Sequence, residues 1–179
     1  MNEAIVRREI RNMLRYKYGL WPDHWPDIPG VKEQPGRPDL VVMNPKGPGF
    51  YIEVKVLDYK REKSFPFSKI VDRQRRWLST WEMVRPHGSY IAIGVINVPH
   101  RSTYLVPWQE WLQLEERVSE YAAYLPFCAE KGTLIAFQEN KLDFGLLKKY
   151  KLLFGKVLYG KGGWYLPELL EDIMELRRE

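Results

Sequence analysis

Apolar and polar residues recur with clear helical or strand periodicity over most of the first 115 residues. Residues 3–17 carry apolar side chains at i, i+4, i+7 and i+8, which is the spacing of one helix face. That face consists of Val6, Ile10, Met13 and Leu14. Residues 68–84 show a second helical stripe, with Ser68 as the expected N-cap. This stripe consists of Ile70, Trp77, Leu78 and Trp81. We expect each helix to pack its apolar face against a core.

Strand patterns lie between and after these helices. The expected strands cover residues 40–43, 50–57, 89–98 and 103–106. The first two are joined by a turn-rich loop at 44–49, and the apolar run at 89–98 is typical of a central strand. A helix is expected at 108–118. Asp23, His24 and Asp27 lie in a stretch with three prolines, so we interpret them as turn residues of a loop and not as metal ligands.

The last third of the chain has a weaker pattern. We expect a helix at 120–130, a strand at 133–138 and a C-terminal helix at 167–178, whereas the charged loop expected at 59–67 lies between the second strand and the second helix. No linker divides the chain, which predicts one domain over residues 1–179. Its core would span about residues 3–115, and a basic, aromatic extension would span about 120–179.

Composition is that of an ordinary folded protein, with 45% hydrophobic and 28% charged residues. No apolar run is long enough to cross a bilayer, so no membrane partner is expected, and the N-terminus lacks the apolar core of a signal peptide. The single cysteine, Cys128, cannot form an intramolecular disulfide, which favours a cytoplasmic location. Lys plus Arg number 28 against 23 for Asp plus Glu, and this net charge of +5 is compatible with nucleic-acid binding.

The candidate chemistry lies in the hairpin at 36–55. Asp39 directly precedes one strand, and Glu53 and Lys55 share one face of the next because side chains alternate. Asp39, Glu53 and the backbone carbonyl of Val54 would be oxygen ligands for Mg²⁺, and Lys55 would stabilise the charge that develops at a phosphodiester. The alternative is an amphipathic hairpin with a solvated Glu/Lys pair.

Two further polar residues interrupt apolar helix stripes. Glu3 falls near the centre of the first stripe, either as a site acid and further metal ligand or as a first-turn acid favoured by the helix dipole. Gln74 lies within the second stripe, and its amide needs a partner such as a phosphate, a metal-bound water or Lys55. Otherwise it lies at the edge of the stripe and bonds a backbone carbonyl.

Basic residues close to this hairpin are the candidates for DNA binding. They are Lys60, Arg61 and Lys63 in the charged loop, and Lys69, Arg73 and Arg76 at helical spacing. Other chemistries find little support. The three histidines are isolated, no phosphate-binding loop motif is present, and Cys128 has no neighbours that would mark it as a nucleophile.

Pro38-Asp39 followed by Glu53-Val54-Lys55 resembles the motif of the PD-(D/E)xK nuclease superfamily. Residues 65–70 with Gln74 resemble RecU-type Holliday-junction resolvases. Residues 36–40 with Glu3 resemble VRR-NUC nucleases and archaeal-type resolvases. The loop at 44–49 is far too short for the stalk of RecU-type resolvases.

The superfamily resemblance implies an α/β fold with a mixed central β-sheet flanked by helices on both faces, the restriction-endonuclease-like core. It also implies DNA cleavage that depends on Mg²⁺ or Mn²⁺. By position, Asp39 and Glu53 would be metal ligands, Lys55 the catalytic lysine, Glu3 the first-helix acid and Gln74 an auxiliary catalytic residue.

The leading functional hypothesis is a junction resolvase acting on branched DNA as a homodimer, because two symmetric nicks need two sites related by a two-fold axis. The alternatives are another nuclease of the same superfamily, of the flap, single-strand or restriction type, and a non-catalytic nucleic-acid-binding module.

Overall fold

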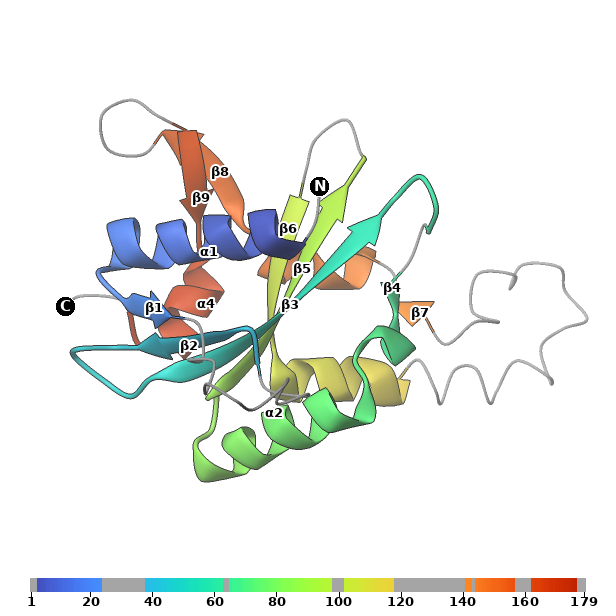
Figure 1. The fold of residues 1–179 in the computed structure, drawn as a ribbon, viewed down its shortest axis with the longest axis horizontal. Coiled ribbons are helices and arrows are strands. Elements are labelled where there is room, and N and C mark those ends of the chain that lie inside the picture. Colours follow the sequence, from blue (N-terminus) through green and yellow to red (C-terminus); the bar gives the residue numbers. More distant parts are fainter. Residues whose placement is uncertain are drawn as a thin grey trace, which may run out of the picture.

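A five-stranded mixed sheet forms the centre of the structure, with the strands in the order β1-β2-β3-β5-β6 (Figure 1). The computed structural model describes residues 3–23, 38–62, 65–97, 102–117, 141–142, 144–156 and 162–176. The strands are β1 (Trp21–Asp23), β2 (Leu40–Met43), β3 (Phe50–Asp58), β5 (Ser89–Ile96) and β6 (Ser102–Pro107). β5 runs parallel to β3, and every other neighbouring pair is antiparallel. All residues of β5 are buried, as its apolar run predicts for a central strand.

Helices α1 (Glu3–Tyr18) and α2 (Asp72–Val84) lie on opposite faces of the sheet, as Figure 1 shows with α1 above and α2 below the strands. Val6 of α1 contacts Gly94, which is in register with Val56 of β3. Tyr51, which points to the other face of β3 by alternation, stacks on Trp81 of α2. The predicted fold class is confirmed: an α/β fold with helices on both faces of a mixed central sheet (Figure 1).

The apolar stripe of α1 is buried as predicted. At Gly94 of β5 the helix packs especially close to the sheet. A Cβ added at Gly94 would lie 2.4 Å from Cγ2 of Val6. Only glycine therefore allows α1 to approach the sheet this closely. This contact fixes the first turns of α1 against β5, and with them the side chains at positions 3 and 7.

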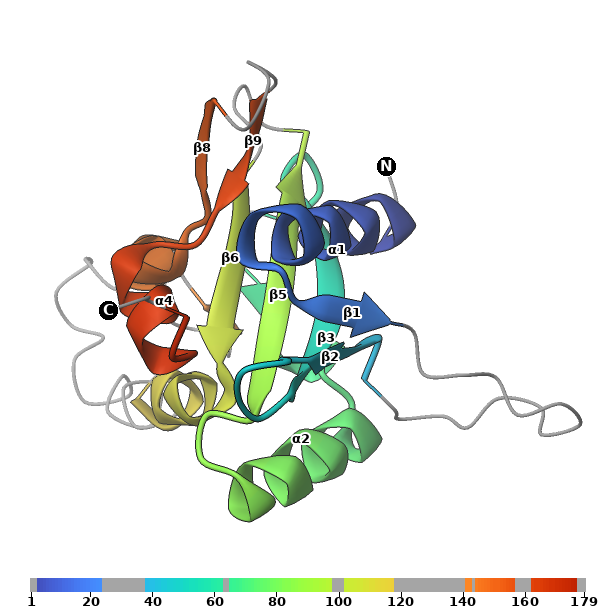
Figure 2. The same ribbon diagram turned by 90° about the vertical axis from the view of Figure 1, so that its left-hand side faces the viewer.

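Short elements from the rest of the chain complete the fold. These are β4 (Phe65–Pro66) with β7 (Lys141–Leu142), the 3₁₀ helices η1 (Phe67–Lys69) and η4 (Phe144–Tyr150), the hairpin of β8 (Leu153–Lys156) and β9 (Gly162–Tyr165), and α4 (Glu168–Ile173). Residues 108–117 form a further helix beside α2. Figure 2 shows α4 on the β6 side of the sheet. The Tyr18 hydroxyl ties α1 to this part, because it accepts the Leu166 N–H at 2.9 Å and donates to Glu171 at 2.8 Å.

Four sequence predictions need correction. Residues 21–23 form the edge strand β1 and not a loop, since a proline is tolerated where a strand pairs on one side only. The second helix begins at Asp72, with Val71 and not Ser68 as N-cap, and Ser68 and Ile70 precede it. Residues 65–66, expected in a loop, pair with β7. The C-terminal helix is shorter than predicted.

Some predictions fall on residues outside the described ranges. These are His24, Asp27, Lys63, His100, Cys128, and the helix and strand expected at 120–130 and 133–138. Among the helices that the structure does describe, none combines the length and the apolar character needed to cross a bilayer.

Candidate metal and phosphodiester site

Asp39 directly precedes β2 and lies beside Glu53, at the point where β3 continues beyond its pairing with β2. Leu40 pairs with Ile52, so continuing the antiparallel register by one residue places Asp39 opposite Glu53. The Val54 N–H donates a 2.8 Å hydrogen bond to Asp39 Oδ2. Since the N–H and C=O of one strand residue point to the same edge, the Val54 carbonyl also faces the side on which Asp39 lies. The register of the hairpin therefore places the two carboxylates and this carbonyl together.

Glu53 is a buried carboxylate, with only 2% of its surface exposed. Its Oε1 accepts two contacts, an ion pair with Lys55 Nζ at 2.8 Å and a hydrogen bond from Gln74 Nε2. Lys55 reaches it because residues two apart on a strand share one face. Within the described part of the chain, no hydrogen bond to Glu53 Oε2 is formed, so this oxygen is the one available to a ligand.

Gln74 connects the start of α2 to this carboxylate. It is the third residue of the helix, and its Oε1 accepts the N–H of the N-cap residue Val71 at 3.2 Å. This is half of a capping box, because the Val71 side chain has no acceptor to complete it. The remaining Nε2 group donates to Glu53. The partner of the Gln74 amide is therefore a site carboxylate, and neither a backbone carbonyl nor Lys55.

Helix α1 contributes one expected and one unexpected residue. Glu3 is exposed at the first turn, in contrast to the inward orientation that its place in the stripe suggested. Arg7, one turn further on, lies with its guanidinium Nη1 3.4 Å from Asp39 Oδ1. Sequence reasoning missed Arg7. The sequence feature that could have indicated Arg7 is its spacing of four residues from Glu3, which places both side chains on the same side of the helix.

The electrostatics of the site disfavour a charged Glu53. Burial is the largest cause that raises the pKa of this carboxyl, the negative charges of Asp39 and Glu3 also raise it, Lys55 lowers it, and the resulting pKa is about 7. The net shift is upward in spite of the ion pair with Lys55. Glu53 thus belongs to the class of buried groups with strongly perturbed pKa values that are enriched at functional sites.

The donor set fits a hard divalent cation that keeps several waters. Among the described residues, no group of three or more His, Cys, Asp or Glu side chains has the geometry of a metal cluster. Asp39 and Glu53 are a pair of carboxylates, and Mg²⁺ is commonly bound through one or two carboxylates together with waters and substrate phosphates. The free Oε2 of buried Glu53 fits that role.

The predicted DNA-binding residues differ in their surroundings. Arg73 and Arg76 are exposed on α2, and Lys60 and Arg61 are exposed after β3. Lys69 is not on α2, and its Nζ lies 2.6 Å from Glu62. The basic face predicted for α2 is therefore Arg73 and Arg76, with Lys69 apart from it.

Arg75, which lies between these two arginines, points inward. Its Nη1 and Nη2 donate to Glu115 at 2.5 and 2.8 Å, and it also donates to the carbonyls of Phe67 and Ile70. This bidentate pair joins the start of α2 to the helix at 108–117. Arg75 therefore has a structural role, which sequence spacing did not reveal.

No protein-family model and no curated protein matches the sequence. Among solved structures, the chain is similar to the Holliday junction resolvase Hjc of Archaeoglobus fulgidus, at 20% identity and a TM-score of 0.34, over 57% of this chain and 76% of that one. A likeness at this TM-score carries no conclusion about function.

Proposed function

We propose that the chain is a divalent-metal-dependent nuclease that hydrolyses phosphodiester bonds in DNA. The observation that carries the proposal is Glu53, a carboxylate buried beside Asp39 in surroundings, chiefly its burial, that raise its pKa to about 7. A protein that needed only stability would be served at least as well by an uncharged residue. Metal binding would explain why a destabilising buried carboxylate is present at this position.

Each residue of the site has a part in this chemistry. Asp39, Glu53 and the Val54 carbonyl would bind Mg²⁺ or Mn²⁺, which when bound would neutralise phosphate charge and acidify a water. Lys55 would stabilise the negative charge that grows on the phosphate oxygens during attack. Gln74 orients Glu53 through its hydrogen bond, and exposed Glu3 would act through its charge.

The substrate we propose is DNA, most specifically a branched form such as a four-way junction. Exposed Arg73 and Arg76 on α2, with Lys60 and Arg61 beyond β3, would contact phosphates and make binding sensitive to salt. Symmetric cutting of a junction requires two active sites, so the junction-resolving form of the proposal includes a homodimer. Cleavage of a flap or of single-stranded DNA needs only one site.

The test is cleavage of junction, flap, single-stranded and linear duplex DNA with Mg²⁺, with Mn²⁺ and with EDTA. We expect metal-dependent cleavage, fastest on the junction, and a loss of at least about 100-fold in Asp39→Asn, in line with removal of one electrostatic group from an active site. Asp172→Asn is the matched control, because it makes the same change at an exposed position of α4.

Two results would limit or overturn the proposal. If linear duplex is cut as fast as the junction, the protein is not a junction resolvase. The proposal then reduces to a nuclease of another kind. No cleavage of any substrate with either metal, together with equal effects of both variants on binding, would favour a non-catalytic nucleic-acid-binding module.

A further inference from the structure

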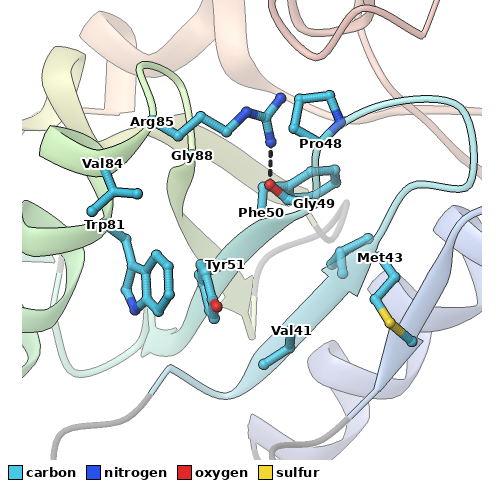
Figure 3. A pocket seen from close by; sticks show the side chains of 11 residues that line it. Val41, Met43, Pro48, Gly49, Phe50, Tyr51, Trp81, Val84, Arg85 and Gly88 are labelled. Atoms are coloured by element: carbon cyan, nitrogen blue, oxygen red, sulfur yellow. Dashed lines mark hydrogen bonds between the residues drawn. The ribbon is translucent and has the colours of Figure 1, made fainter.

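An apolar groove with a volume of about 290 Å³ opens between the end of α2 and the β2–β3 hairpin (Figure 3). Its walls include Val41, Met43, Tyr51, Trp81, Val84 and Arg85. Met43 is 57% exposed and Val84 is 69% exposed, so both apolar side chains stand at the rim in contact with solvent. Such a concave apolar surface on a charged protein is typical of a binding site.

The groove continues the candidate site along the same face of the sheet. Tyr51 precedes Glu53 by two residues, so the two side chains share a face of β3 and are about 6.6 Å apart along the strand. On α2, Gln74 and Trp81 are seven residues apart on one side of the helix, or about 10 Å along its axis. β3 and α2 thus place the carboxylates and the groove on the same face of the sheet, next to each other along the strand. A ligand with a phosphate at Glu53 would extend directly towards Tyr51 and Trp81.

Flat aromatic rings form the side of the groove towards α2. Tyr51 and Trp81 stack with their ring centroids 4.4 Å apart and an interplanar angle of 25°, and Trp77 stacks on Trp81 at 6.5 Å and 20°. Figure 3 shows the Trp81 and Tyr51 rings next to each other at the base of the groove, below Val84. The stacked ring faces cover each other, so the aromatic surface open to a ligand is the part of Tyr51 and Trp81 that lines the groove.

A positive charge stands at the upper rim. The Arg85 guanidinium donates a hydrogen bond to the Gly49 carbonyl, which bridges α2 and the hairpin (Figure 3). A flat apolar wall with a cation at its rim matches a nucleotide, whose base has a π-face and whose phosphate is negative. An apolar peptide segment would use the walls but would leave Arg85 without a counter-charge.

We propose that this groove binds one nucleobase of the substrate, unstacked from its neighbours, beside the phosphodiester presented to Asp39 and Glu53. This inference rests on the proposed nuclease function and narrows its substrate class. The preferred substrate is nucleic acid with an unpaired nucleotide at the cleavage point, as at a branch, a flap or a single strand. Continuous duplex cannot supply that base without breaking a pair.

The test measures binding without cleavage, in EDTA, to a set of single-stranded oligonucleotides in which one abasic position is moved along the sequence. For the wild type we expect one position at which loss of the base lowers affinity by about 10-fold, as expected for loss of one stacked base. Val84→Asp places a charge at the rim of the groove. We expect it to weaken binding of the intact oligonucleotide by a similar factor and to cause no further loss on the abasic one.

Met83→Asp is the matched control, because it adds the same charge at the neighbouring position of α2, where Met83 is 79% exposed and does not line the groove. It should keep the wild-type abasic profile. Equal weakening by Val84→Asp and Met83→Asp would overturn the proposal. The proposal would also be overturned if the affinity did not depend on the abasic position and Val84→Asp bound as tightly as the wild type. That result would favour an apolar protein partner as the ligand of the groove. Cleavage with Mg²⁺ and its loss in Asp39→Asn are measured separately, so failure of the groove and failure of the nuclease proposal are distinguishable.

Discussion

Replacing Glu53 with glutamine should stabilise the metal-free protein at pH 8. It should also abolish the rise in Tm that we expect when Mg²⁺ is added. The folded state raises the pKa of Glu53 from 4.5 to about 7, so the folded protein holds this proton more tightly than the unfolded chain. The stability associated with the protonated carboxyl is fully present below pH 4.5 and is lost as the pH rises towards 7. A shift of this size corresponds to about 3 kcal/mol of unfolding free energy at pH 8.

Glutamine removes the buried charge but also deprives Lys55 of its counter-charge, which lies 2.8 Å away. The expected net gain for Glu53→Gln at pH 8 is therefore about 1–3 kcal/mol, which is a rise in Tm of at least about 2 °C for a chain of this length. The assay is thermal unfolding in EDTA at pH 8 and at pH 4.5. At the lower pH the carboxyl of the wild type is largely neutral and the gain should shrink.

Adding Mg²⁺ at pH 8 should then raise the Tm of the wild type and not that of Glu53→Gln, because a ligand that binds only the folded state stabilises it. Glu116→Gln, at an exposed position of the helix at 108–117, makes the same substitution and should change neither quantity. The reasoning is refuted if Glu53→Gln lowers the Tm equally at both pH values. That result would mean that the ion pair with Lys55 is worth more than the burial of the charge costs.

Two further predictions concern the packing that positions the site. Gly94→Ala should cost about 1–3 kcal/mol in urea unfolding, because its Cβ would lie 2.4 Å from Val6, and adding Val6→Ala should restore part of that loss; additive losses in the double variant would contradict this packing. Arg75→Ala should cost about 1–3 kcal/mol through loss of its partly buried bidentate pair with Glu115, whereas Arg76→Ala at the exposed neighbouring position should cost little; equal effects in urea unfolding would contradict the structural role of Arg75.

The parts of the fold that the sequence predicted are those governed by local periodicity. The buried face of α1 follows from a period of 3.6, and the shared face of Glu53 and Lys55 follows from a period of two. The place of Asp39 beside Glu53 needed one more step, the short turn that makes the two strands antiparallel neighbours. Because each step uses only neighbouring residues, the central hairpin could be predicted from its own sequence.

The start of α2 was mispredicted because distant contacts outweigh a local preference. Ser68 is a good N-cap by residue type, but Arg75 bonds the carbonyls of Phe67 and Ile70, and Phe67 packs edge-on against Trp111. These contacts keep residues 67–70 out of the α-helix. The consequence reaches the site, since a helix that starts at Asp72 makes Gln74 its third residue and directs it to Glu53.

Arg7 was missed because its significance depends on which residue faces it across the fold. On the helix it is an ordinary flanking charge next to Val6, and only the approach of α1 to Gly94 places its guanidinium near Asp39. The edge strand β1 has the same explanation. Its pairing with β2 joins segments that are far apart in the sequence, and its proline argued locally for a loop.

The ion pairs Arg7–Asp39 and Lys55–Glu53 bear on the function of the site. If the ion pair with Lys55 compensated the buried charge in full, the pKa of Glu53 would not lie above its usual value. It lies above, at about 7, because burial and the charges of Asp39 and Glu3 outweigh Lys55. Above the pKa of Glu53, the three carboxylates Asp39, Glu53 and Glu3 and the two cations Arg7 and Lys55 leave one net negative charge among these described residues. In the proposed nuclease a divalent cation would supply positive charge here, and a phosphate bound with it would be a further partner for Arg7 and Lys55.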